Sequence, residues 1–437
     1  MGSTRFPIVS TLYVTINVYN ILFLGSKESA VTNINAFALF LRSLVPATAA
    51  VKLVCIREYE LLGIDEKTIG VLYEDYFSTF AKALYMDAKH TILSLNDVDF
   101  YHWSTIDAIP MLSRLELDCL MSTDIHTALV IKASPILQYL AIGINNASTL
   151  LQDGNGRDVT YPNLQYLQMY YCDGANLNGT RGTSNPVVFP VLKCLKLSPV
   201  YPFADDVVFR GNSATLEYLN ISMDRGVVEM LHVNGVFESN RKALKVVVVR
   251  EIDNHQDISL TSKAILSKFL HCFSRHAQYM TLLPSLLTSF PMPGSKYGDS
   301  FTNVQVLDMS SRALSFFEIL RLLKTFPILR KLVCCIDGLG IESEHIPENK
   351  VPDYIVATHR DIGKSLQIWC MSGFNGQPSC DILEYIMLLA LVCPKFYRAD
   401  VNLGLIPNYN ARLSAALESG PYSKYSPRLA GLLMREM

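Results

Sequence analysis

A short apolar pattern recurs along most of this chain, and it constrains the fold more than any other feature. Each copy has a proline or small residue, then any residue, then apolar-x-x-apolar-x-apolar. The clearest copies occupy residues 110–117, 135–142, 162–169, 190–197, 214–221, 242–249, 302–309 and 327–334. Weaker copies lie at residues 7–14, 49–56, 89–95, 276–282, 364–371 and 394–401. Self-similarity of this kind is typical of a repeat protein.

The copies are almost evenly spaced through the middle of the chain. The first apolar position falls at residue 112 and recurs after 25, 27, 28, 24, 28, 33, 27 and 25 residues, which reaches residue 329. This spacing matches the period of about 20–29 residues of leucine-rich repeats, with one insertion. We therefore expect an α/β leucine-rich-repeat solenoid, a horseshoe of about fourteen irregular units over residues 1–404.

The pattern also predicts how each unit is built. Alternate residues of a strand face opposite sides, so apolar-x-apolar predicts a short strand with one buried face. Between the copies, apolar residues recur every three or four positions, which predicts helices. Helices are expected at Thr32–Val45, Glu74–Met86, Ser262–Phe273, Ser315–Thr325 and Asp381–Val392. Ser315 and Glu318 have capping-box spacing. Parallel strands would then line the concave face, with helices on the convex face.

Some segments break the pattern. Irregular inserts that loop off one edge are expected at residues 173–188, 284–300 and 337–362. From residue 405 the repeat ends, and two short helices around Ala411–Glu418 and Ser426–Met437 are expected instead. We expect residues 405–437 to form a C-terminal helical cap over the last unit.

Composition limits the compartment and the kind of partner. Half of the 437 residues are hydrophobic and 18% are charged, which indicates a well-buried chain. A net charge of −2 argues against a nucleic-acid partner. No apolar run approaches the roughly 20 residues that span a bilayer, and no signal peptide is recognised, so a cytoplasmic or nuclear protein without a membrane partner is expected. The ten cysteines lack paired spacing and are expected to be buried free thiols.

No segment predicts catalysis. DGNGRD (153–158) begins like a calcium loop, but Arg157 and Asp158 stand where an oxygen ligand and a glycine belong, so a polar turn is expected. His271 and His276 lie five residues apart at a helix end, where their side chains would diverge, and the other histidines have no metal-ligand spacing. No hydrolase, zinc-protease or kinase signature occurs. We expect no cofactor, no metal and no enzymatic activity.

The strand side of the sheet is the expected working surface. The two residues that flank the middle apolar position of each copy point outward, among them the pairs Arg114/Glu116 and Arg398/Asp400. Outward tyrosines at 139, 166 and 218 would form an aromatic ladder. Tyrosine is a favoured binding anchor, but it is also common in strands for its propensity alone, and both interpretations stay open. The expected protein-binding residues of the concave face are Tyr139, Tyr166, Gln168, Tyr170, Lys196, Tyr218, Asn220, Arg250 and Asp308.

Two helix-and-strand phrases carry a family resemblance. LRLLKTFPILRKLVCCIDG (320–338) and FPVLKCLKLS (189–198) resemble the ribonuclease-inhibitor-like leucine-rich-repeat proteins, in particular the repeat regions of fungal F-box proteins. The resemblance covers nearly the whole chain. It implies a protein-protein interaction module that holds the substrate of an SCF ubiquitin ligase, with an F-box helical motif docking on the SCF adaptor.

The start of the chain departs from that plan. The first repeat-like unit begins at Pro7, so no F-box is expected within this sequence. The alternative is a non-catalytic interaction scaffold with no ubiquitin link. In both cases we expect a protein partner on the concave face and a monomer when the chain is alone.

Overall fold

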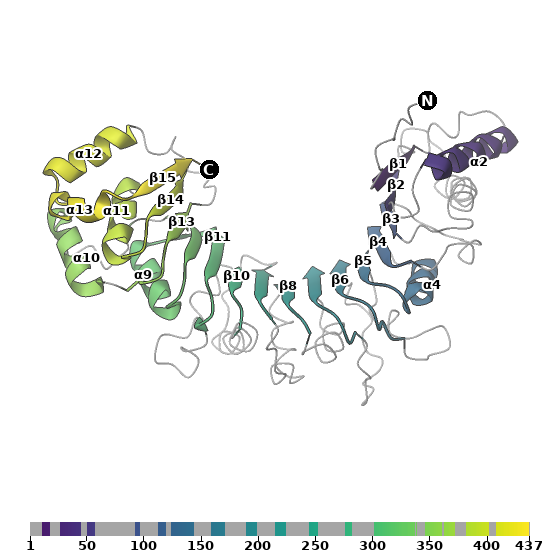
Figure 1. The fold of residues 1–437 in the computed structure, drawn as a ribbon, viewed down its shortest axis with the longest axis horizontal. Coiled ribbons are helices and arrows are strands. Elements are labelled where there is room, and N and C mark those ends of the chain that lie inside the picture. Colours follow the sequence, from purple (N-terminus) through teal and green to yellow (C-terminus); the bar gives the residue numbers. More distant parts are fainter. Residues whose placement is uncertain are drawn as a thin grey trace, which may run out of the picture. The chain divides into compact units, whose positions relative to one another are not determined.

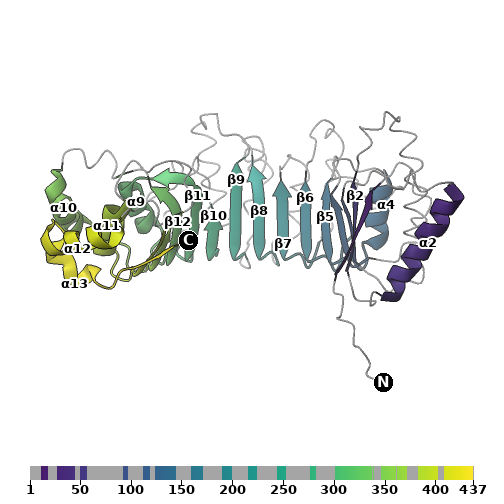
Figure 2. The ribbon, with the colours of Figure 1, turned by 90° about the horizontal axis from the view of Figure 1, so that it is seen from above.

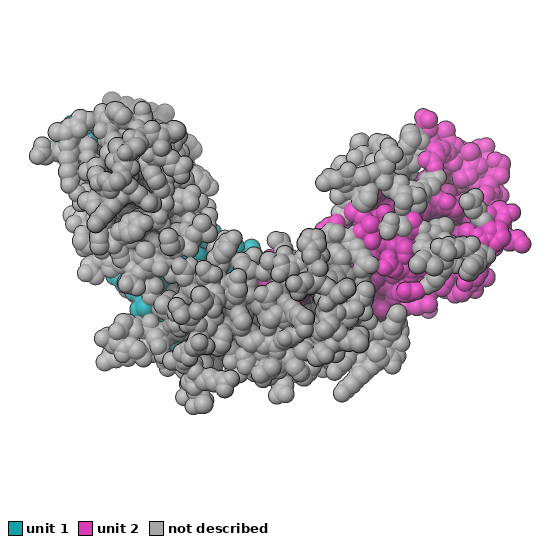
Figure 3. Space-filling view, turned by 180° about the vertical axis from the view of Figure 1, so that it is seen from behind, with its two compact units in different colours: residues 1–216 teal, residues 217–437 magenta. Residues whose placement is uncertain are grey.

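The chain forms two compact units, Met1–Leu216 and Glu217–Met437, which Figure 3 colours separately. A computed structural model describes a subset of the residues in each. The described residues are 11–17, 27–44, 50–56, 92–96, 112–118, 124–143, 159–170, 189–198, 215–223, 244–251, 276–281, 301–336, 338, 346–360, 362–371, 382–401 and 408–436.

Parallel strands that pair in sequence order form the first unit. The strands are β1 (Thr11–Asn17), β2 (Ala50–Ile56), β3 (Ile92–Asn96), β4 (Arg114–Asp118), β5 (Tyr139–Gly143), β6 (Tyr166–Tyr170) and β7 (Cys194–Ser198). Figure 2 shows β5, β6 and β7 side by side and pointing the same way. Helix α2 (Lys27–Leu44) follows β1, and α4 (Asp124–Ala133) follows β4 (Figure 1).

The second unit repeats this order and carries more of the described helices. Its strands are β8 (Tyr218–Met223), β9 (Val246–Glu251), β10 (Tyr279–Thr281), β11 (Val306–Leu314), β12 (Lys331–Ile336), β13 (Ile368–Cys370), β14 (Arg398–Val401) and β15 (Leu433–Glu436). Its helices are α9 (Phe316–Thr325), α10 (Val351–His359), α11 (Ile382–Val392), α12 (Tyr409–Ser419) and α13 (Ser426–Leu429), with 3-10 turns at Glu348–Lys350 and Ser423–Tyr425.

The expected repeat of parallel strands is confirmed. Each of the fourteen copies of the pattern overlaps one of the strands β1 to β14. The helices expected around residues 32–45, 315–325, 381–392 and 411–418 are also confirmed, as α2, α9, α11 and α12. The helices expected at 74–86 and 262–273, and the inserts at 173–188 and 284–300, lie outside the described residues.

Three expectations differ from the structure. The segment 337–362 contains helix α10, although it was expected to be irregular. Helix α4 was not expected at all. The helix expected over Ser426–Met437 is wrong beyond Leu429, because Leu433–Glu436 forms β15 and pairs with β14. Sheet pairing therefore overrides local helix preference at this end.

Buried side chains from adjacent strands line up in columns. In the first unit, Leu115, Leu140, Leu167 and Leu195 occupy one register row and are all fully buried. In the second unit, the corresponding row runs through Leu307, Leu332, Trp369 and Ala399, which are also fully buried. Each strand covers the apolar residues of its neighbour, which a single strand could not bury alone.

A repeated backbone contact fixes the register between units. The carbonyl of Gln138 accepts hydrogen bonds from the N–H groups of Gln165 (2.9 Å) and Tyr166 (3.1 Å), where strand β6 of the next repeat begins. The carbonyls of Ser113 and Gln165 do the same in the first unit. In the second unit this role falls to Glu217, Lys245, Gln278, Gln305, Arg330 and Gln367. One oxygen thus aligns two donors and prevents a one-residue slip, which would turn every side chain to the other face.

Helices α9 and α11 complete the core of the second unit. Ser315 and Glu318 form the expected capping box, with Glu318 N–H donating to Ser315 Oγ (3.2 Å) and Ser315 N–H to Glu318 Oε2 (2.8 Å). Tyr385 on α11 is buried, and its hydroxyl donates to the Leu314 carbonyl (3.2 Å). Trp369 Nε1–H donates to Cys334 Sγ at 3.3 Å.

The C-terminal segment is tied to helices α10 and α11. Tyr422 is buried and donates to Glu384 Oε1 (3.0 Å) on α11. Lys424 and Tyr425 both contact Asp353 on α10, and these hydrogen bonds hold the pKa of that carboxyl below its usual value. Within the described parts of the chain, no helix has the length and apolar character to cross a bilayer.

Candidate protein-binding surface

In each unit the sheet has one buried face and one partly exposed face, which we call the open face. The open face carries the residues that flank the middle apolar position of each repeat. In the first unit, its described positions on β4 to β7 are Arg114 and Glu116, Tyr139 and Ala141, Tyr166 and Gln168, and Cys194 and Lys196. The register sets them in two rows that cross the strands.

Two tyrosines stack in the first of these rows. The rings of Tyr139 and Tyr166 lie 4.1 Å apart between centroids and within 9° of parallel. Because the two residues are register partners on adjacent parallel strands, the sheet spacing itself brings the rings to stacking distance. Two of the three tyrosines in the predicted ladder, Tyr139 and Tyr166, therefore form a stacked pair.

A cation covers each end of this pair. The Arg114 guanidinium carbon lies 4.0 Å from the centre of the Tyr139 ring, and Lys196 Nζ lies 5.3 Å from the centre of the Tyr166 ring. Ring faces attract cations because their π electrons present negative charge. We call these four side chains, Arg114, Tyr139, Tyr166 and Lys196, the capped tyrosine stack.

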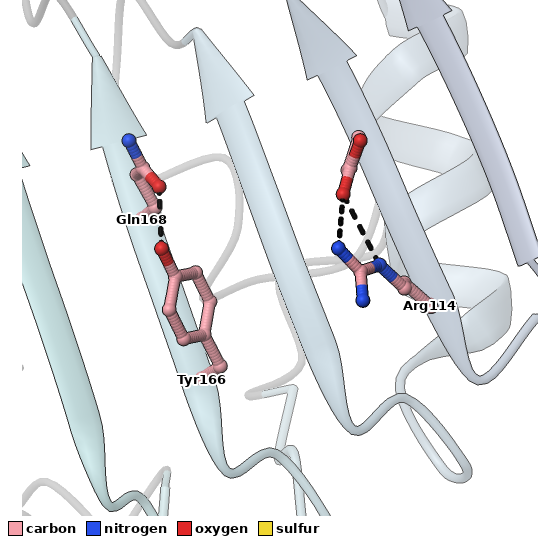
Figure 4. A network of polar contacts seen from close by, with 4 residues as sticks. Arg114, Tyr166 and Gln168 are labelled. Atoms are coloured by element: carbon pink, nitrogen blue, oxygen red, sulfur yellow. Dashed lines mark hydrogen bonds and ion pairs between the residues drawn. The ribbon is translucent and has the colours of Figure 1, made fainter. Parts of the chain in front are cut away.

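Two hydrogen-bonded pairs hold the stack in place (Figure 4). Arg114 donates from Nε (3.1 Å) and Nη2 (2.6 Å) to Glu116 Oε1. The Tyr166 hydroxyl donates to Gln168 Oε1 at 2.6 Å. Each pair joins residues two apart on one strand, so the same alternation that exposes them also places them together.

Burial and neighbouring charges keep these groups in fixed protonation states. Burial raises the pKa of the Tyr139 phenol, and Tyr166 raises it further, so Tyr139 stays neutral. Burial would lower the pKa of Arg114, but Glu116 outweighs it and the pKa is raised. Burial also raises the pKa of the Cys194 thiol to about 11, against the opposing effect of Lys196.

The second unit holds four of the expected residues, Tyr218, Asn220, Arg250 and Asp308. Tyr218 and Asn220 are half-buried on β8, and Asp308 on β11 accepts hydrogen bonds from the Tyr279 hydroxyl (3.1 Å) and the Ser310 N–H (3.0 Å). Tyr218 therefore belongs to a different unit from the stacked pair. Tyr170 ends β6 and Arg250 lies in β9, but their side chains are not among those described.

Sequence reasoning missed two members of these surfaces. Arg114 was recognised as facing outward but not as a cap on Tyr139, because the sequence does not show which residue its neighbouring strand presents. Tyr279 was passed over, although it flanks the middle apolar residue Met280 of a weak copy of the pattern. The alternation rule alone would have found it.

A metal-binding site has no support among the described residues. Across the described ranges, no three histidine, cysteine, aspartate or glutamate side chains are grouped so as to hold a metal ion. Cys194, Cys334, Cys335, Cys370 and Cys393 carry free thiols.

Comparison with known proteins leaves the family open. No protein-family model matches the chain, and no curated protein matches it. Among solved structures, the chain is similar to the leucine-rich repeat-containing protein LegL7 from Legionella pneumophila. That likeness has a TM-score of 0.31 and 11% identity, and it covers 90% of this chain and 83% of that chain. The α/β repeat architecture of this chain therefore rests on its own strands and their register.

Proposed function

We propose that the chain is a non-catalytic protein-interaction module and that the capped tyrosine stack is its principal contact surface. The stacked rings of Tyr139 and Tyr166 are the observation that carries this proposal. Stacking and hydrogen bonding hold both rings before any partner arrives, so little side-chain freedom is lost on binding. Tyrosine and arginine are also the residues that most often dominate binding energy at protein interfaces.

The same groups are poorly suited to acid–base catalysis. A general acid or base works best with a pKa near the working pH. Burial moves the pKa of Tyr139 away from neutrality, and Glu116 raises that of Arg114. The stack thus favours contact with a partner over proton transfer.

A selection from a random peptide library displayed on phage tests this proposal. The wild-type chain is expected to enrich a set of peptides, and the double variant Tyr139→Ala/Tyr166→Ala is expected to lose them. The matched control is Tyr354→Ala/Tyr397→Ala, which removes two exposed tyrosines from outside the stack. Circular dichroism verifies that all three proteins fold. Equal enrichment by the wild type and the stack variant would overturn the proposal.

A narrower proposal is that the chain recognises the substrate of an SCF ubiquitin ligase, as the repeat region of a fungal F-box protein would. It rests on the resemblance of residues 189–198 and 320–338 alone, and the comparisons add nothing to it. The alternative is an interaction scaffold without a ubiquitin link. Co-precipitation with the SCF adaptor and cullin separates the two: recovery of both supports the ligase role, and their absence supports the scaffold.

Other residues and segments expected from the sequence are included in this proposal. Gln168 adjoins the stack, and Tyr218, Asn220 and Asp308 would form a second contact surface on the other unit. Residues 405–437 are proposed as a cap on the array of residues 1–404. The contacts of Tyr422 with Glu384 and of Tyr425 with Asp353 support that role.

A further inference from the structure

At the β4 end of the stack, the acidic side chain is more buried than the basic side chain that it pairs with. The Glu116 side chain is 16% exposed, whereas that of Arg114 is 41% exposed. Arg114 donates two hydrogen bonds to the same oxygen of Glu116, Oε1. A partner approaching β4 therefore meets the guanidinium before the carboxylate.

The other end of the stack also presents hydrogen-bond donors. Gln168 and Lys196 are register partners on β6 and β7. Because Gln168 Oε1 accepts from Tyr166, the amide nitrogen of Gln168 points away from that hydroxyl (Figure 4). An amide N–H and an ammonium thus sit on neighbouring strands, which is a combination that suits a carboxylate.

We infer that the capped tyrosine stack binds an acidic peptide segment in which two carboxylates flank a hydrophobic stretch. One carboxylate meets Arg114, the other meets Lys196 and Gln168, and the hydrophobic residues cover the edges of the two tyrosine rings. This inference rests on the proposed function and adds the chemistry of the partner.

The sheet also sets the spacing of the two acids. Strands β4 and β7 are three strand spacings apart, or about 14 Å. An extended peptide advances about 3.3 Å per residue, so a peptide that crosses the strands covers this distance in about four residues. Glu-x-x-x-Glu is therefore the spacing that engages both cations at once.

A peptide suits this surface better than a nucleic acid does. Aromatic rings flanked by cations also bind unpaired bases, so the two must be distinguished. Nucleic-acid binding draws most of its affinity from many phosphate contacts. The stack offers two cations, and the whole chain has a net charge of −2.

Fluorescence anisotropy with labelled synthetic peptides tests the inference. The peptides carry two glutamates separated by one to six leucine- and glycine-containing positions, each with a matched glutamine version. We expect the tightest binding with about three intervening positions, as in Glu-x-x-x-Glu, and binding about tenfold weaker for the glutamine version. Added salt should reduce this difference, since the contacts lie at the surface.

Protein variants make the test specific. Arg114→Gln/Lys196→Gln should abolish the preference for glutamate, and Lys196→Glu should create a preference for a basic residue at one end. Lys245→Gln is the matched control, because Lys245 is an exposed lysine of the other unit. It should behave like the wild type.

The outcomes separate this inference from the proposed function. Peptide binding that depends on Tyr139 and Tyr166 but shows no preference for glutamate would overturn the inference and leave the proposed function standing. Failure to bind any peptide would overturn both. Tighter binding of single-stranded oligothymidylate than of any acidic peptide would overturn the inference in favour of a nucleic-acid partner.

Discussion

Two arginines begin equivalent strands, one in each unit, and each holds an acidic residue two positions further along. Arg114 donates to Glu116 on β4, and Arg398 donates to Asp400 Oδ1 (2.6 Å) on β14. The local geometry is the same, because both pairs lie on the open face of a parallel strand. Their surroundings differ.

The adjacent strand decides what each pair does. Beside Arg114 the register places Tyr139, and the guanidinium covers its ring. Beside Arg398 it places Ile368 on β13 and Leu433 on β15, while Cys370 donates to Asp400 Oδ2 (3.4 Å). In the first unit the pair caps an aromatic stack, and in the second it joins a buried thiol. One backbone arrangement thus supports the proposed binding surface in one place and internal packing in the other.

Truncating a core side chain next to each pair should have the largest effect on the free energy of unfolding. Trp369 lies in the buried row beside β14, and Leu140 lies in the buried row beside β4. Trp369→Ala should lower the free energy of unfolding by about 3–5 kcal/mol, because it also removes the donor to Cys334. Leu140→Ala should cost about 2–5 kcal/mol. Urea unfolding followed by circular dichroism measures both, and a loss below about 1 kcal/mol at either site would contradict the described burial.

Neutralising Asp400 should lower the free energy of unfolding more than neutralising Glu116. Asp400→Asn removes the charge of a side chain that is 9% exposed and bonded to both Arg398 and Cys370. Its cost should be about 2 kcal/mol. Glu116→Gln should cost about 1 kcal/mol or less, since Arg114 is more exposed and keeps its contact with Tyr139. The same unfolding measurement applies, and a larger loss for Glu116→Gln would reverse the ranking.

Coupling between tyrosines should differ between the units. A double-mutant cycle of Tyr139→Ala and Tyr166→Ala should give about 0.5–1.5 kcal/mol, as expected for stacked rings. The matched cycle on Tyr218 and Tyr279 should give a smaller coupling, because the strand with Val246 lies between them in register. Equal coupling in the two cycles would show that contact between rings is not its source.

The smallest effect should be on thiol chemistry alone. Because burial raises the pKa of Cys194 to about 11, the neutral thiol predominates at pH 8 and iodoacetamide should react more slowly than with free cysteine. The rate should rise as the pH approaches 11. Lys196→Met should slow the reaction further, since the Lys196 charge lowers this pKa. Site-resolved mass spectrometry follows the modification, and a rate equal to that of free cysteine would contradict the burial.

The sequence predicted the repeat strands better than it predicted the segments that break the repeat. Alternating apolar residues such as Leu115 and Leu117 identify a strand without any knowledge of its neighbours. Val351–His359 was missed because residues 337–362 break the repeat and were expected to be irregular, although Pro352 in the first turn is compatible with a helix. Leu433–Glu436 was missed because only its pairing with β14 makes it a strand.

The candidate surface could be predicted only in part, because alternation along a strand is visible in the sequence and the pairing between strands is not. Alternation placed Tyr139 and Tyr166 on one face, but their contact depends on the register between β5 and β6. The contact of Lys196 with the ring of Tyr166 depends in turn on the pairing of β6 with β7. A single sequence does not encode these cross-strand relations in any local pattern.

The carbonyl that binds two N–H groups of the next repeat has an evolutionary consequence. From β4 to β7 and from β8 to β14, each described repeat meets its neighbour through the same pair of bonds, so a whole repeat could be gained or lost there without leaving mismatched edges. A change of one repeat between Arg114 and Lys196 would alter their separation by one strand spacing, about 4.8 Å. Descendants of such a chain would change partners in discrete steps, each matched by one or two residues in the peptide they recognise.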